Sequence, residues 1–188
     1  MELSDRIQSA LARRAPSEED GAVLRWAAVA LVLAPTSSGD ADVLLIRRAL
    51  FDGDPWSGHV ALPGGRRDPS DGDLLVTALR ETREETGLEL RREACLGQLD
   101  DLRPRRGLPL GIVVRPFVFA VPERPRLQLS REVAAELWTP LDVLRGQRVS
   151  ARVEVRGSQL DEPAVRLGSD VLWGMTLRIL DGFLERIG

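Results

Sequence analysis

The segment from residue 62 to 88, LPGGRRDPSDGDLLVTALRETREETGL, constrains the fold more than any other part of the chain. Pro63, Gly64 and Gly65 predict a sharp turn after a strand, because glycine lets the backbone turn tightly and approach a bound group. The residues that follow have helical spacing, and Gly87 is the left-handed glycine that commonly ends a helix. The segment therefore predicts a turn, one helix and a defined stop.

The start of this helix carries several side chains that can cap it. Ser70 or Asp71 is expected to be the capping residue, because a short polar side chain can accept from the free N–H groups of the first turn. Asp73, three residues after Ser70, would complete a capping box.

Three glutamates follow on the predicted helix. At about 100° per residue, Glu85 falls inside the apolar arc, Glu81 at its edge and Glu84 further round. The arc is formed by Leu74, Leu75, Ala78, Leu79 and Thr82. Like charges one turn apart, as at Glu81 and Glu85, repel by roughly 0.2–0.5 kcal/mol even on an exposed helix. A divalent cation would relieve this repulsion, and Arg80 can pair with Glu84; a solvated charged face is the alternative interpretation.

Residues 80–88, RETREETGL, resemble the second half of the Nudix box, Arg-Glu-aliphatic-any-Glu-Glu-any-Gly-aliphatic. The first half departs from the pattern: Asp71 stands where glutamate is usual, and one residue more than usual then precedes Arg80. Thr82 also replaces the aliphatic residue. This looser first half, GGRRDPSD followed by ALRE, is similar to the form common in the coenzyme A diphosphatase branch.

Two upstream segments add to the resemblance. LLIRRA at 44–49 and GHVALPGG at 58–65 partly match that branch's LLTxRS and GxxxFPGG, and WGMT at 173–176 is similar to its Trp-Gly-x-Thr run. LFDGDPWS at 50–57 lacks the basic residue expected there. The resemblance covers most of the chain from Trp26 onward.

The resemblance implies an α/β Nudix fold, a mixed β-sheet sandwiched between α-helices with a long C-terminal helix. We expect residues 1–22 to form an N-terminal helix and linker, and residues 23–188 the Nudix hydrolase domain. Mg²⁺ or Mn²⁺ is the implied cofactor. The implied metal ligands are Glu81, Glu84, Glu85 and Gly65; the implied catalytic residues are Arg80, Glu84 and Glu85; Glu132 and Glu136 are candidates for an extra carboxylate.

The substrate implied by the branch is coenzyme A or acyl-CoA, cut at its diphosphate. Arginine forks suit phosphate oxygens, although solvated arginines are an equally open alternative for the basic loop. The candidate substrate-binding residues are Arg47, Arg48, Arg103, Arg105 and Arg106. One alternative function is hydrolysis of another nucleoside diphosphate derivative (ADP-ribose, an oxidised nucleotide or a dinucleoside polyphosphate). Another is a non-catalytic nucleotide sensor, but the presence of all three glutamates argues against a sensor.

Hydrophobic periodicity predicts the other elements. A near-continuous apolar run over 26–34 predicts a buried central strand, which would form a hairpin with a strand at 43–47. Later segments also have strand or helix patterns. Strands are expected at 94–99, 113–121, 149–155 and 164–167, the last two flanking a polar loop GSQLDEP; the segment 130–144 should give a strand and a short helix; helices are expected at 3–14 and 170–187.

Composition limits the partners. A net charge of −3 gives no general attraction to nucleic acid or to an anionic membrane. No segment has the length of a membrane span, so a cytoplasmic protein is expected, with dimerisation left open. Cys95, the single cysteine, excludes an internal disulfide, and the single histidine, His59, is expected to be structural, with a substrate contact as the alternative.

Overall fold

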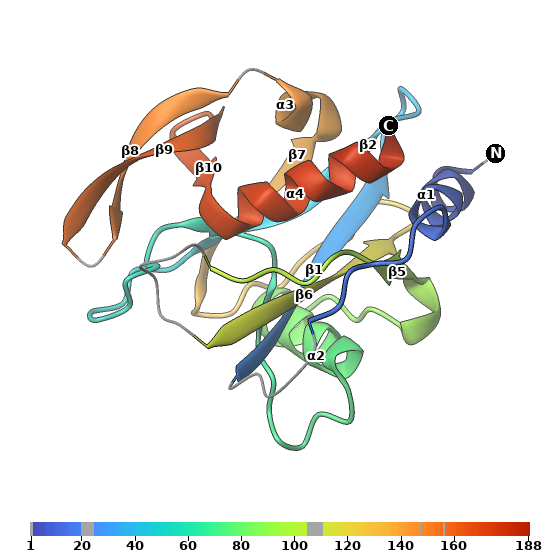
Figure 1. The fold of residues 1–188 in the computed structure, drawn as a ribbon, viewed down its shortest axis with the longest axis horizontal. Coiled ribbons are helices and arrows are strands. Elements are labelled where there is room, and N and C mark those ends of the chain that lie inside the picture. The colour runs from blue at the N-terminus through green and yellow to red at the C-terminus, as the bar shows by residue number, and fades with distance from the viewer. Residues whose placement is uncertain (1, 20–24, 105–110, 147, 156) are drawn as a thin grey trace.

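The computed structural model describes residues 2–19, 25–104, 111–146, 148–155 and 157–188 (Figure 1). The chain forms a seven-stranded sheet, a three-stranded sheet and the helices that pack on them. The strands are β1 (Arg25–Pro35), β2 (Ala41–Arg48), β3 (Val60–Ala61), β4 (Gly64–Arg66), β5 (Cys95–Gln98), β6 (Ile112–Ala120), β7 (Val133–Pro140), β8 (Val149–Val155), β9 (Ser158–Leu167) and β10 (Asp170–Trp173). The helices are α1 (Leu3–Ala12), α2 (Leu74–Thr86), α3 (Leu141–Arg145) and α4 (Gly174–Ile187), with a 3₁₀ turn at Arg92–Ala94.

The large sheet is mixed, with β1 at its centre. β1 pairs in parallel with β6 and antiparallel with β2 and β4, and β7 continues the sheet beyond β2. Most of β1 is buried, because both faces of a central strand are covered. The predicted central strand and its hairpin with the next strand are therefore confirmed.

Two apolar cores lie on the two sides of this sheet. One contains side chains of α1 and α4, including Leu11 and Phe183, and the other contains Ala78 of α2 with Phe119 of β6. Figure 1 shows α4 and α2 on opposite sides of the central strands. Among the described helices, none is both long and apolar enough to cross a membrane.

The cap of α2 differs from the prediction. The helix begins at Leu74, and its N-cap is Asp73, whose carboxylate accepts from the Val76 N–H at 2.8 Å. Ser70 instead bonds to Asp68, and the Asp71 carboxylate is taken by other donors described below. The predicted stop is confirmed, since Gly87 has φ +70° and its N–H donates to the Arg83 carbonyl.

The C-terminal region differs in two places. Residues 158–163, predicted as part of a polar loop, belong to β9 and pair with β8, where most of their side chains are exposed. Residues 170–173, predicted as the first helical turn, form β10 and pair with β9, so that α4 begins at Gly174 with φ +67°. Apolar residues adjacent in sequence, such as Val171 and Leu172, fit either a buried helix or a strand, and here the partner strand decides.

Candidate active site

Two glycines bring β4 close to the neighbouring elements. Gly64 has φ +148°, and a Cβ there would lie 2.4 Å from the Ala28 carbonyl oxygen of β1. At Gly65, a Cβ would lie 2.5 Å from the carboxylate carbon of Glu81. A side chain at either position would therefore displace the strand or the carboxylate.

The glutamates of α2 lie in the order of burial that their helical spacing predicts. Glu85 is 4% exposed, and its Oε2 accepts from the Gly64 N–H at 2.8 Å. The Glu81 side chain is 19% exposed, and the Glu84 side chain is 52% exposed. Of these three carboxylates, those of Glu85 and Glu81 lie against the glycines of β4.

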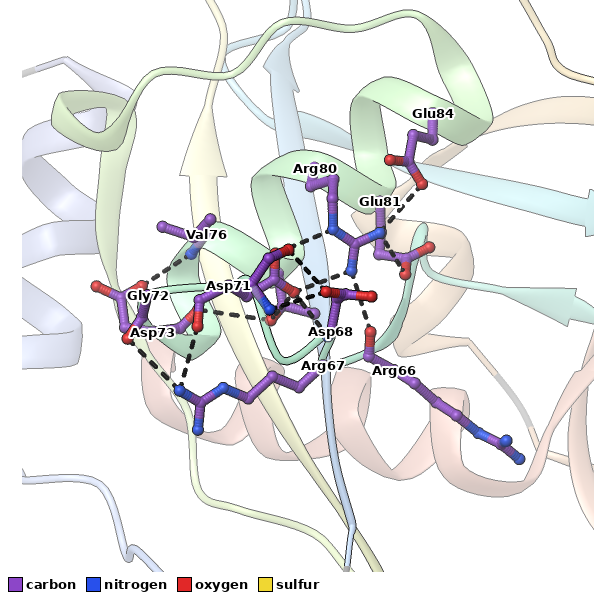
Figure 2. Close-up of polar contacts among 12 residues, drawn as sticks. Arg66, Arg67, Asp68, Asp71, Gly72, Asp73, Val76, Arg80, Glu81 and Glu84 are labelled. Atoms are coloured by element: carbon purple, nitrogen blue, oxygen red, sulfur yellow. Dashed lines mark hydrogen bonds and ion pairs between the residues drawn. The ribbon is translucent and has the colours of Figure 1, made fainter.

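Arg80 connects Asp71, which precedes α2, with Glu81 and Glu84 of the helix (Figure 2). Its Nε and one terminal nitrogen donate to the two oxygens of Asp71 at 3.0 and 2.9 Å. Its other terminal nitrogen donates to Glu81 at 2.9 Å and to Glu84 at 3.0 Å, so the predicted Arg80–Glu84 pair is present. The terminal nitrogen that bonds to Asp71 also donates to the Arg66 carbonyl of β4 at 3.1 Å. Because one guanidinium bonds to all of these groups, Arg80 fixes α2 relative to β4 and to the 67–73 loop.

Asp71 is the residue whose role sequence reasoning missed. Its side chain is 3% exposed, and it also accepts from the Asp68 N–H at 2.9 Å and from the Thr77 hydroxyl at 2.8 Å. The bidentate bond from Arg80 holds the pKa of the Asp71 carboxyl well below its usual range. The available signal was its place in the Nudix pattern, at the position where a glutamate is usual.

Negative charge accumulates at the inner glutamates. Burial raises the pKa of Glu85 to about 7, against the opposing effect of the Gly64 N–H, and the nearby Glu81 and Glu132 carboxylates raise it further. The positive charge of Arg48 acts in the opposite direction. Burial also raises the pKa of Glu81. These carboxylates repel one another in the absence of a cation.

Of the two candidates for an extra carboxylate, the structure brings Glu132 to this cluster. The Glu132 carbonyl accepts from the Ala49 N–H at 2.8 Å, and the Ser130 N–H donates to the Glu85 carbonyl at 2.9 Å. These bonds hold the turn before β7 beside the end of α2. Glu136 lies on β7, paired with Ile46, and is exposed.

Arg48 is the predicted substrate arginine that lies beside the carboxylates. It pairs with Asp54 of the 50–58 loop at 2.8 Å, and its charge lowers the pKa of Glu85. Its buried Nε has no hydrogen-bond partner among the described residues. A buried donor without a partner is costly, so the position of this side chain is maintained at the expense of a hydrogen bond.

The other predicted arginines have different surroundings. Arg47 pairs with Asp170 of β10 at 3.1 Å, and Arg103 pairs with Glu19 of the N-terminal segment at 2.8 Å. Neither ion pair involves a carboxylate of α2. Two further arginines fall outside the described residues: Arg105 and Arg106.

The donor set fits a hard divalent cation. Glu81 and Glu85 supply carboxylate oxygens, the Gly65 backbone lies against Glu81, and Glu132 adds negative charge nearby. In the described part of the chain, no three acidic, histidine or cysteine side chains are already close enough together to hold a metal. The Glu81 carboxylate is bonded to Arg80, so metal binding requires Glu81 to exchange this partner.

Known proteins are similar to this chain in sequence and in fold. The NUDIX domain family model matches residues 23–156. The crystal structure of a MutT/nudix family protein from Enterococcus faecalis superposes with a TM-score of 0.62 at 22% identity, covering 100% of this chain and 70% of that chain. The fold that the resemblance implied, a mixed sheet between helices, is confirmed.

Curated relatives match different lengths of the chain. The uncharacterised protein C14C4.10c of Schizosaccharomyces pombe is 41% identical over 123 residues, 62% of this chain but 37% of that protein's length. The uncharacterised Nudix hydrolase NudL of Yersinia enterocolitica is 29% identical over 171 residues, 84% of this chain and 80% of that protein. Mitochondrial coenzyme A diphosphatase NUDT8 of Mus musculus is 50% identical over 48 residues, 26% of this chain and 23% of that protein.

Proposed function

The chain belongs to the Nudix hydrolase family, and from this we propose that it hydrolyses the diphosphate bond of coenzyme A or acyl-CoA. The products are adenosine 3′,5′-bisphosphate and (acyl)phosphopantetheine. The observation that carries the proposal is the buried Glu85 and partly buried Glu81 facing the Gly64–Gly65 turn. The short similarity to a coenzyme A diphosphatase and the GGRRDPSD segment support this substrate.

The acidic residues would hold Mg²⁺ or Mn²⁺. Both ions prefer carboxylate, carbonyl and phosphate oxygens, and the ligands we assign are Glu81, Glu84, Glu85 and the Gly65 carbonyl. When bound, the metal supplies charge neutralisation at the diphosphate and lowers the pKa of the attacking water.

The chain's own residues then act around the reacting phosphate. Glu84, half exposed and bonded to Arg80, takes the proton of the attacking water, and Glu132 is the alternative base. Arg80, held by Asp71, orients Glu84. Arg48 contributes positive charge beside the inner carboxylates, which favours a bound diphosphate there.

A second candidate is hydrolysis of another nucleoside diphosphate derivative, such as ADP-ribose. Two observations favour it: the 50–57 loop has no basic residue, and Arg47 and Arg103 are bonded to Asp170 and Glu19. A 3′-phosphate would then lack these two arginines. The chemistry at Glu81 and Glu85 is the same in both cases.

The test is a substrate panel with identification of the products by mass. Coenzyme A, acetyl-CoA, dephospho-CoA, ADP-ribose, diadenosine polyphosphates and oxidised dGTP are each incubated with Mg²⁺, with Mn²⁺ and with chelator. We expect coenzyme A or acetyl-CoA to be cut best and chelator to stop the reaction. A clear preference for another compound would replace the substrate but keep the reaction class.

The assigned site is tested separately with Glu85→Gln. We expect this variant to lose metal-dependent turnover while it keeps its fold by circular dichroism. Unchanged hydrolysis would remove Glu85 from the site. Tight nucleotide binding by the wild type without any turnover would favour a nucleotide sensor.

A further inference from the structure

A cavity of about 560 Å³ lies between the 50–58 loop and the β8–β9 hairpin. This volume is within the usual range of small-molecule sites. Residues from two distant parts of the sequence line it: Gly53, Asp54, Pro55, Ser57, His59, Glu154 and Gly157. Neither the proposed metal ligands nor the proposed base belongs to this lining.

Three aromatic rings, those of Trp56, His59 and Trp173, pack against one another beside the cavity. The ring centroids of Trp56 and His59 are 5.8 Å apart, those of His59 and Trp173 are 5.2 Å apart, and both contacts are edge-to-face. Trp56 and Trp173 also pack with the buried side chains of the three-stranded sheet. Because the rings join the 50–58 loop to β10, the cavity wall is held in place before any ligand binds.

Arg48 connects the cavity to the candidate active site. Its N–H donates to the His59 carbonyl at 3.0 Å, its carbonyl accepts from the Gly58 N–H at 3.2 Å, and its side chain pairs with Asp54. The same side chain lowers the pKa of Glu85. A substrate whose diphosphate contacts Arg48 can therefore extend one end into the cavity.

The charged side chains of the cavity lining are acidic among the described residues. Its described members include two carboxylates, Asp54 and Glu154, and no arginine. Asp54 is neutralised by Arg48, whereas Glu154 is exposed and has no ion pair among the described residues. Burial lowers the pKa of His59, which leaves the imidazole neutral at pH 7. Among the described lining residues, the carboxylates and backbone therefore offer hydrogen-bond acceptors, and Glu154 is the carboxylate without a described ion-pair partner.

We propose that this cavity binds the uncharged, amide-bearing arm of the substrate and that Glu154 selects against an arm that ends in an anionic group. The proposal rests on the proposed function and assigns the two ends of the substrate. The pantetheine arm, with its amide N–H donors and a neutral acyl group, suits the acceptors of the cavity. A terminal carboxylate would meet the Glu154 carboxylate.

The first experiment compares kcat/KM for acetyl-CoA and succinyl-CoA, which differ in a terminal carboxylate. We expect the wild type to prefer acetyl-CoA and Glu154→Gln to reduce this preference by about two- to fivefold, the size typical of interactions between solvent-exposed charges. Asp161→Asn is the matched control, since it removes one charge from the same hairpin at an exposed β9 position outside the cavity lining. The same preference in all three proteins would overturn the proposal.

A second measurement separates this inference from the proposed function. Pantetheine, which carries no phosphate and no nucleotide, is titrated into the protein in chelator while tryptophan emission is followed, because Trp56 and Trp173 both pack against His59 of the cavity lining. We expect a saturable change in the wild type and in Trp138→Phe, and a reduced one in Trp56→Phe. No saturable change at millimolar pantetheine would overturn the cavity assignment. Absence of turnover with every coenzyme A ester would instead refute the proposed function.

Discussion

The burial of Glu85 makes the metal-free protein sensitive to pH. Burial raises the pKa of Glu85 from 4.5 to about 7. The folded protein therefore binds a proton at this carboxyl at pH values where the unfolded chain has released it. A group with a raised pKa stabilises the fold fully below the unfolded pKa, and this contribution is lost as the pH rises through the folded pKa. We expect the free energy of unfolding to fall between pH 4.5 and a little above 7.

The size of this effect follows from the shift. A pKa change of one unit corresponds to 1.36 kcal/mol, so the Glu85 shift corresponds to about 3 kcal/mol across the window. The raised pKa of Glu81 acts in the same direction. The lowered pKa of His59 acts in the opposite direction below pH 6.5, because protonation of His59 is then unfavourable in the folded state. The quantity to measure is therefore the difference between the wild type and a Glu85 variant.

The assay is urea unfolding in chelator at pH 5, 6, 7 and 8 for the wild type and Glu85→Gln. Glutamine keeps an oxygen that can accept from the Gly64 N–H but does not titrate. We expect the variant to gain about 2.5 kcal/mol relative to the wild type between pH 5 and pH 8, because pH 5 already lies above the unfolded pKa. Parallel stability curves for the two proteins would refute the assignment of Glu85 as the buried titrating group.

Four further predictions follow from the same geometry. Mg²⁺ should raise the melting temperature more at pH 8 than at pH 5, because the ion binds the ionised carboxylates; equal shifts would argue against these ligands. Gly65→Ala should keep the fold but lower Mn²⁺ affinity in calorimetry by about tenfold or more by displacing Glu81, whereas Gly72→Ala, which meets open space, should not. Asp71→Ala should cost about 3 kcal/mol in urea unfolding by leaving Arg80 without its buried partner; a cost below 1 kcal/mol would refute this. Asp71→Glu should cost about 1–3 kcal/mol in the same assay by overpacking, although glutamate is usual in the family pattern.

The central part of the fold could be predicted because several local signals agree there. β1 has a continuous apolar sequence, and α2 has an apolar arc with a glycine at its C-terminal end. The same spacing that buries Ala78 also places Glu85 inward, so the graded exposure of the glutamates follows from helical geometry. The burial of a side chain could be predicted from the sequence where the geometry of a single helix or strand determines which way the side chain points.

The remaining features depend on contacts between distant segments. Residues 158–163 pair with β8, but most of their side chains are exposed. The strand could not be predicted because its sequence has no alternation of apolar and polar residues. Arg103 is bonded to Glu19, a partner 84 residues away. Nothing in the local sequence distinguishes this ion pair from a free phosphate-binding arginine.

The departure at Asp71 is the feature for which sequence and structure together give a physical explanation. The chain has a shorter acidic residue than usual at this position and one additional residue before Arg80. In the fold, Asp71 is buried and accepts both bonds of a bidentate pair from Arg80, while the N–H of Asp68 and the hydroxyl of Thr77 satisfy its oxygens further. An added methylene would have to fit into a site that is 3% exposed. With Asp71 in this site, the Arg80 guanidinium also reaches Glu81 and Glu84.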